Sequence, residues 1–128
     1  MPPKSPIGSP AEWLARAESS LALARMEGPG ILFEDLCYQS QQAVEKALKA
    51  VLLAKTQQCP FTHDLDALME KLEEAGVEIP EAIDAAGVLT RYAVETRYPH
   101  LQGAVARSHF EEAIRLAESV LDWARGQI

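Results

Sequence analysis

Aromatic residues are scarce in this sequence: Phe, Trp and Tyr make up 6% of the chain, although hydrophobic residues make up 48%. Sheets usually draw on aromatic and β-branched residues, whereas Ala and Leu favour helices. A core built mainly from Ala, Leu, Val and Ile therefore predicts closely packed helices. No stretch alternates apolar and polar residues as a strand would.

Long apolar runs are also missing. No window holds the roughly 18 consecutive apolar residues that a membrane-spanning helix needs, so we expect no contact with a membrane. The opening residues, MPPKSPIGSP, include no apolar stretch long enough for a signal peptide. We expect residues 1–8 to form a disordered lead-in and residues 9–128 to form one domain, which suits a chain of 128 residues.

Cysteine and positive charge are limited. Cys37 and Cys59 follow no pairing pattern, which is typical of reduced thiols in a cytoplasmic protein. The formal net charge of -7 argues against a non-specific nucleic-acid binder that relies on phosphate contacts. A local basic patch remains compatible with this charge.

Strong catalytic motifs are absent. The seven glycines are scattered, so the chain has no glycine-rich phosphate-binding loop. There is no CxxC motif, and His63, His100 and His109 lack the spacing of metal ligands. We therefore expect no metal and no cofactor.

Helix signals are clear in the first half of the chain. A capping box at Ser9–Glu12 predicts the start of a first helix, which Gly28–Gly30 ends. A second helix is predicted over about 32–55 from its apolar stripe. Thr62 is expected to cap a short third helix, with His63 as a surface residue of its first turn.

The second half predicts two further helices. Pro80 opens a fourth helix that runs to about Arg97, and Pro99 closes it. A second capping box at Ser108–Glu111 predicts the start of the last helix. Four long helices with short connections predict an all-α fold: an antiparallel up-and-down four-helix bundle with the third helix as a short addition.

The fourth helix raises two questions. Arg97 falls on its core-facing line, where a charged side chain is costly. Its guanidinium either extends outward and complements the helix C-terminus, or projects into a cleft to bind phosphate. Outside one polar stripe this helix is apolar almost all round, which predicts a second buried side. We expect that side to form a homodimer interface.

The second helix carries polar residues on both sides. Ser40 and Gln41 fall inside the apolar arc, which indicates a buried hydrogen bond or a close helix approach. Lys46 and Lys49 are predicted to face outward. Glu45 borders the arc and is expected to form an ordinary surface pair with Lys49.

Three motifs occur in a recognisable order: QQAVEKALKAVL at Gln41–Leu52, THDL at Thr62–Leu65 and RYP at Arg97–Pro99. Together with the alanine-rich last helix, they resemble the HEPN family, named for higher eukaryotes and prokaryotes nucleotide-binding. The similarity covers about residues 11–125.

This resemblance implies a helical bundle that dimerises and contacts a nucleotide or RNA. It also implies a partner, a minimal nucleotidyltransferase, in a toxin–antitoxin-like module. The motif residues expected to contact the nucleotide or RNA are Arg97, Tyr98, Lys46, Lys49 and His63.

Many HEPN proteins are metal-independent ribonucleases that use an arginine followed four to six residues later by a histidine. Here two residues separate Arg97 from His100, so the chain departs from that spacing. The departure favours a binding or partner-regulating role. Two alternatives stay open: a ribonuclease toxin that uses Arg97 and His100 as catalytic residues, and a dimeric helical interaction module without a ligand.

Overall fold

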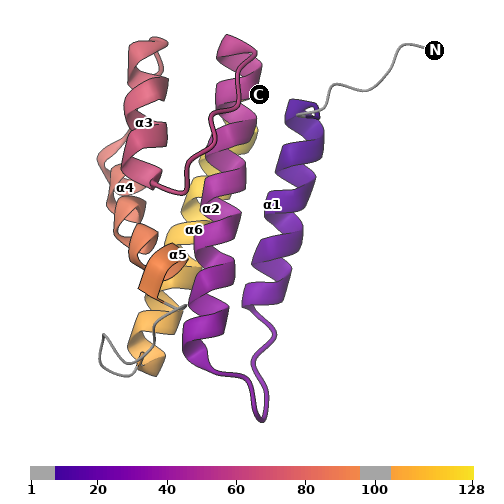
Figure 1. Ribbon diagram of the computed structural model, residues 1–128, viewed down its shortest axis with the longest axis vertical. Helices are drawn as coiled ribbons and strands as arrows, with labels where there is room; N and C mark the ends of the chain where they lie inside the picture. Colours follow the sequence, from indigo (N-terminus) through magenta and orange to yellow (C-terminus); the bar gives the residue numbers. More distant parts are fainter. Residues whose placement is uncertain (1–7, 96–104) are drawn as a thin grey trace, which may run out of the picture.

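The computed structural model describes residues 8–95 and 105–128, and every regular element in them is helical. The elements are α1 (Pro10–Ala24), α2 (Phe33–Thr56), α3 (Leu65–Glu74), α4 (Glu81–Asp84), the 3₁₀ helix η1 (Ala85–Thr90), α5 (Arg91–Glu95) and α6 (Arg107–Gln127). Figure 1 shows α1 and α2 antiparallel and side by side, α6 behind α2, and α3 to α5 on the opposite side from α1. The predicted all-α bundle is confirmed. In the described ranges, no helix is long and apolar enough to cross a membrane.

The first two helices begin where their signals predict, although α1 ends at Ala24, before the predicted stop at Gly28. Ser9 is the N-cap of α1, and its hydroxyl accepts a hydrogen bond from the Glu12 backbone N–H at 3.1 Å. This confirms the capping residue predicted there. The last residue of α2 is Thr56, and the following residue, Gln57, adopts a left-handed conformation with φ 62° that ends the helix.

The start of α3 differs from the prediction. Asp64, not Thr62, is the N-cap: its Oδ1 accepts from the backbone N–H groups of Asp66 and Ala67 at 3.0 and 3.3 Å. Thr62 lies two residues earlier, where its hydroxyl accepts from the Asp64 N–H at 3.1 Å. Thr62 thus shapes the turn before the helix, and His63 belongs to that turn.

The start of α6 also differs. The helix begins at Arg107 with Ala106 as N-cap, so the cap predicted at Ser108 is wrong. Nδ1 of His109 accepts a hydrogen bond from the Ala106 backbone N–H at 3.0 Å. The His109 side chain therefore accepts the hydrogen bond from the N-cap backbone that a Glu or Gln three residues after the cap usually accepts.

The predicted fourth helix is broken into α4, η1 and α5. Gly87 in η1 lies against α3, where an added Cβ would be 2.1 Å from Oδ1 of Asp66. Three residues further on, the hydroxyl of Thr90 accepts from the Leu65 backbone N–H at 3.0 Å. The tighter 3₁₀ winding accompanies this close packing on the start of α3. A projection that assumes one continuous helix therefore fails beyond Asp84.

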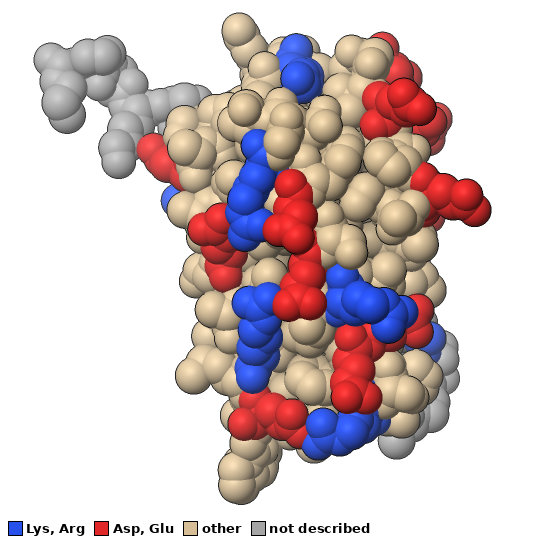
Figure 2. All heavy atoms as spheres, turned by 180° about the vertical axis from the view of Figure 1, so that it is seen from behind, with Lys and Arg blue, Asp and Glu red and all other residues tan. Residues whose placement is uncertain are grey.

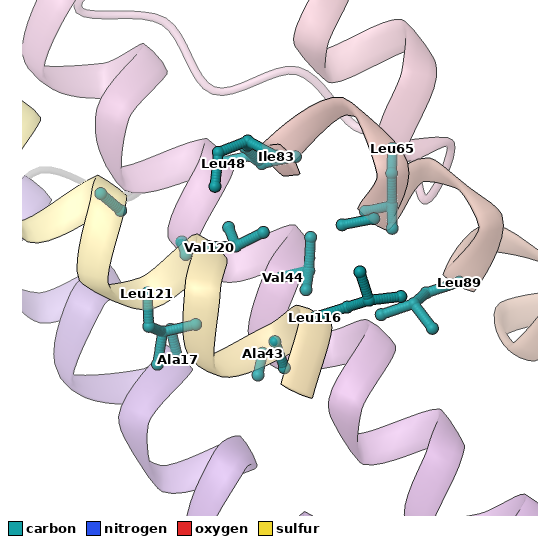
Figure 3. Close-up of a cluster of buried hydrophobic side chains, with 14 of the residues drawn as sticks. Ala17, Ala43, Val44, Leu48, Leu65, Ile83, Leu89, Leu116, Val120 and Leu121 are labelled. Carbon is teal, nitrogen blue, oxygen red and sulfur yellow. The ribbon is translucent and has the colours of Figure 1, made fainter. Parts of the chain in front are cut away.

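The core lies between α1, α2, α6 and the α3–α5 side, and Figure 3 shows part of it. Small residues line the contacts of the three long helices. The fully buried alanines of α1, α2 and α6 are Ala17, Ala24, Ala43, Ala47, Ala50, Ala113, Ala117 and Ala124. Because these side chains are short, the helix axes approach closely and the larger leucines fill the space toward α3.

Candidate functional site

A row of polar side chains is buried on α2. Gln41, Glu45 and Lys49 follow each other at i, i+4 and i+8, so they lie along one line of the helix. Their exposed fractions are 0%, 4% and 6%. Polar groups buried to this extent need partners, and the α2–α3 connection supplies them.

The α2–α3 connection, residues 57–64, runs back along α2 before α3 begins (Figure 1). It places Nδ1 of His63 2.8 Å from Oε1 of Glu45. Because a carboxylate only accepts hydrogen bonds, Nδ1 carries the shared proton. Nε2 of Gln41 donates to the backbone oxygen of His63 at 3.2 Å. The ring and the backbone of His63 are both held, while 60% of its side chain stays exposed.

The Glu45 carboxylate is the centre of this cluster. Its Oε2 accepts from Nζ of Lys49 at 3.0 Å, and its Oε1 also accepts from Nε2 of Gln41 at 3.1 Å. Burial by itself raises the pKa of Glu45, but the hydrogen bonds from His63, Lys49 and Gln41 outweigh it and lower the pKa below its ordinary value. The cluster therefore holds an ionised carboxylate beside the buried Lys49.

Lys46 lies on the neighbouring line of α2 and reaches α1. Its Nζ donates to the hydroxyl of Ser20, a buried residue of α1, at 2.8 Å. Burial lowers the pKa of Lys46, and the positive charges of Arg16 and Lys49 lower it further, although Glu45 opposes them. The three cations therefore lie close enough to repel one another.

An aromatic ring lies among these cations. The guanidinium carbon of Arg16 is 5.7 Å from the centroid of the Trp13 ring, and Nζ of Lys49 is 5.8 Å from it. Both distances are within the range of a cation–π contact. We call Trp13, Arg16, Lys46, Lys49 and His63 the α1–α2 edge. It combines an indole, on which a base can stack, with cations that attract phosphate.

Several sequence predictions change in this region. The predicted pair of Glu45 with Lys49 is confirmed, but its predicted place on the surface is wrong because both side chains are buried. The buried hydrogen bond predicted for Gln41 is confirmed. The hydroxyl of Ser40 is buried, but among the described residues it has no hydrogen-bond partner.

The remaining predicted site residues, Arg97, Tyr98 and His100, lie outside the described residues. Their roles therefore stay predictions. The helix before them, α5, packs on α2, where Tyr92 forms a side-chain hydrogen bond with Cys37. Burial of the Cys37 thiol raises its pKa to about 11, although this hydrogen bond lowers it. Cys37 is therefore an inert core thiol.

Sequence reasoning missed Trp13, Arg16 and the central place of Glu45. The i, i+4, i+8 row of Gln41, Glu45 and Lys49 was a usable signal, because three polar residues on one line of an alanine-rich helix indicate a shared environment. No comparable signal connects Trp13 to α2, since their contact depends on how the two helices pack.

The α6 face has a different electrostatic character. Figure 2 shows acidic and basic side chains interleaved on the side of the molecule opposite to the view of Figure 1. Arg25 pairs with Glu118, and Arg107 pairs with Glu27. Arg125 contacts Glu18 at 3.1 Å and Asp122 at 2.5 Å. These cations are locally neutralised, so this face offers no continuous basic surface to a phosphate backbone.

Within the part of the chain that the structure describes, no group of three or more His, Cys, Asp or Glu side chains could hold a metal ion.

Comparison with known proteins supports the sequence resemblance. The HEPN domain family model matches residues 10–127. The structure of TT1696 from Thermus thermophilus is similar, with 32% identity, a TM-score of 0.81 and coverage of 93% of this chain and 98% of that one. ST0689, an archaeal HEPN homologue, has 26% identity, a TM-score of 0.73 and coverage of 93% and 97%. No curated protein matches. Because the family model spans nearly the whole helical domain and both solved structures share its bundle, the chain belongs to the HEPN domain family.

Proposed function

We propose that this HEPN-domain protein binds a nucleotide or RNA at the α1–α2 edge. The observation that carries the proposal is a cluster of cations in a chain of net charge -7: Arg16 and Lys49 contact the Trp13 ring, and both lie close enough to Lys46 to lower its pKa. Cations that repel one another are costly to bring together, and an anionic ligand would relieve that cost.

The edge offers distinct contacts to such a ligand. Lys46 has three N–H donors and gives one to Ser20, so two remain for phosphate oxygens. Trp13 is half-buried and presents part of its ring for stacking. Lys49, which is buried against the Trp13 ring, adds positive charge, although Glu45 partly neutralises it.

The proposal includes the contacts expected from the RYP motif, Arg97 and Tyr98. These two contacts rest on the resemblance of the RYP motif to that of the family. We also propose that the protein forms a homodimer in the cytoplasm and acts as the partner of a minimal nucleotidyltransferase in a toxin–antitoxin-like module. The family resemblance is the support for these last points.

Binding of a short fluorescent single-stranded RNA and of labelled ATP tests the proposal. We expect Lys46→Gln to raise the RNA Kd by about tenfold to a hundredfold, since a charge-assisted phosphate contact contributes about 1.5–3 kcal/mol. Lys55→Gln is the matched control, because it removes the same charge from an exposed site in the last turn of α2. Equal losses in both variants would mean that RNA binding does not depend on the α1–α2 edge. No binding by the wild-type protein would leave a helical interaction module without a ligand.

One observation favours a second candidate function, metal-independent RNA cleavage. His63 is held by a buried carboxylate through Nδ1, so in the neutral ring Nε2 carries the free lone pair. A base oriented by a third group in this way suits removal of a 2′-hydroxyl proton. Cleavage in EDTA that is lost in His63→Asn, or in Arg97→Ala and His100→Ala, would support this candidate. Intact RNA in EDTA would reject it.

A further inference from the structure

Phe61 is fully exposed, with a relative accessibility of 100%. It lies in the α2–α3 connection and does not pack against its own chain. An aromatic side chain buries a large apolar area when it finds a partner, so a protruding ring of this kind marks a contact surface.

The chain holds Phe61 in this position from both sides. Before it, the Gln58 backbone N–H donates to the hydroxyl of Thr56 at 3.1 Å, and Pro60 has a fixed φ. After it, His63 is held by Glu45 and Gln41. Because the connection is tied down at both ends, the ring is presented to a partner at a small entropic cost.

An open pocket of about 480 Å³ lies beside Phe61. Its lining residues are Leu52, Thr56, Gln58, Cys59, Pro60, Lys71, Glu74 and Ala75. Pro60 and Ala75 give it apolar surface, and its volume falls in the range that accepts ligand-sized groups. Phe61 follows Pro60 directly, yet its own full exposure shows that its ring does not fill this pocket.

Two opposite charges line the same pocket. Lys71 and Glu74 both belong to α3, and neither has an ion-pair partner among the residues that the structure describes. The surface thus carries one protruding ring, one pocket, one cation and one anion. Each feature has its complement on the same surface, which is the requirement for contact between identical copies around a two-fold axis.

We propose that two copies dock through this surface, with Phe61 of each copy seated in the pocket of the other and Lys71 of each opposite Glu74 of the other. A second copy is favoured over another protein because the ring and the pocket that would receive it are adjacent in one segment. The inference rests on the proposed homodimer but not on the proposed nucleotide contact. It places the interface at the α2–α3 connection, not on the fourth helix as the sequence suggested.

Sedimentation velocity over a concentration series gives the dimer dissociation constant. We expect Phe61→Ser to raise it by about tenfold or more, as for a central aromatic anchor. Val88→Ser is the matched control, since Val88 is also apolar and 56% exposed but lies in η1. Lys71→Glu and Glu74→Lys should each weaken the dimer, and the double variant should restore it. Circular dichroism confirms that each variant is folded.

A photoreactive benzoylphenylalanine at position 61 maps the contact directly. In a mixture of ¹⁴N- and ¹⁵N-labelled protein, we expect crosslinks between isotopically different chains that end on residues 52–60 or 71–75. A monomer at every concentration would overturn both the homodimer and this interface. A dimer that is insensitive to Phe61→Ser, or whose crosslinks end on other helices, would overturn the interface alone. RNA binding at Lys46 is a separate measurement and decides neither outcome.

Discussion

Glu45 and His63 are 18 residues apart in the sequence, yet Oε1 of Glu45 lies 2.8 Å from Nδ1 of His63. This contact fastens the α2–α3 connection to the middle of α2. On one side of it lie the cations of the α1–α2 edge, and two residues before it lies the exposed Phe61. One buried carboxylate therefore positions both surfaces for which we propose a function.

Replacing Glu45 with Gln should destabilise the protein strongly. The amide has nearly the same size, but it leaves Lys49, which is 6% exposed, without its counter-ion. Removing one partner of a buried pair typically costs about 3–5 kcal/mol. Urea unfolding followed by circular dichroism measures this change. Glu70→Gln, at an exposed position of α3 outside the proposed dimer surface, should stay within about 0.5 kcal/mol. A similar small effect for Glu45→Gln would mean that the pair contributes little.

Stability should fall in acid partly through Glu45. The folded-state pKa of Glu45 is lowered from its ordinary value of 4.5. The stability gained from its ionisation is therefore fully present above about pH 4.5 and is lost as the pH falls through the folded-state pKa. Free energies of unfolding measured from pH 7 to pH 3 should decline less steeply below pH 4.5 in Glu45→Gln than in the wild-type protein. Parallel curves for the two proteins would contradict this assignment.

The bundle was predictable because helix periodicity and caps are local signals. The Ser9 cap and the extent of α2 follow from residues within a few positions of each other. The break in the predicted fourth helix was not predictable in this way. It depends on Gly87 meeting Asp66 and on Thr90 meeting Leu65, contacts that only the packing of α3 creates.

In the candidate site, too, local sequence signals were predictable and contacts created by packing were not. The motifs identified Lys46, Lys49 and His63 as candidate site residues. The burial and the partners of each side chain depend on the packing, which the motifs do not contain. Lys49 became the buried partner of Glu45 because α1 and the α2–α3 connection cover that line of α2. Trp13 entered the site only through the packing of α1 on α2.

The capping predictions can be separated by mutation. Asp64→Ala removes the acceptor for two backbone N–H groups at the start of α3 and should cost about 1 kcal/mol. Ser108→Ala changes a residue that the sequence marked as a cap but that lies inside α6, so it should cost less than about 0.5 kcal/mol. Thermal or urea unfolding of both variants compares the two costs. A larger loss for Ser108→Ala would place the start of α6 at Ser108 after all.

The salt dependence of RNA binding should show which cations meet phosphate. Each phosphate contact on a single strand contributes about 0.7 to the slope of log K against log salt. Lys46→Gln and Arg16→Gln should therefore each reduce the slope by about that amount. Arg125→Gln should leave it unchanged, because Arg125 is already paired with Glu18 and Asp122 on the α6 face. Titrations of labelled RNA between low and physiological salt provide the slopes. A reduced slope for Arg125→Gln with none for Lys46→Gln would move the binding surface from the α1–α2 edge to α6.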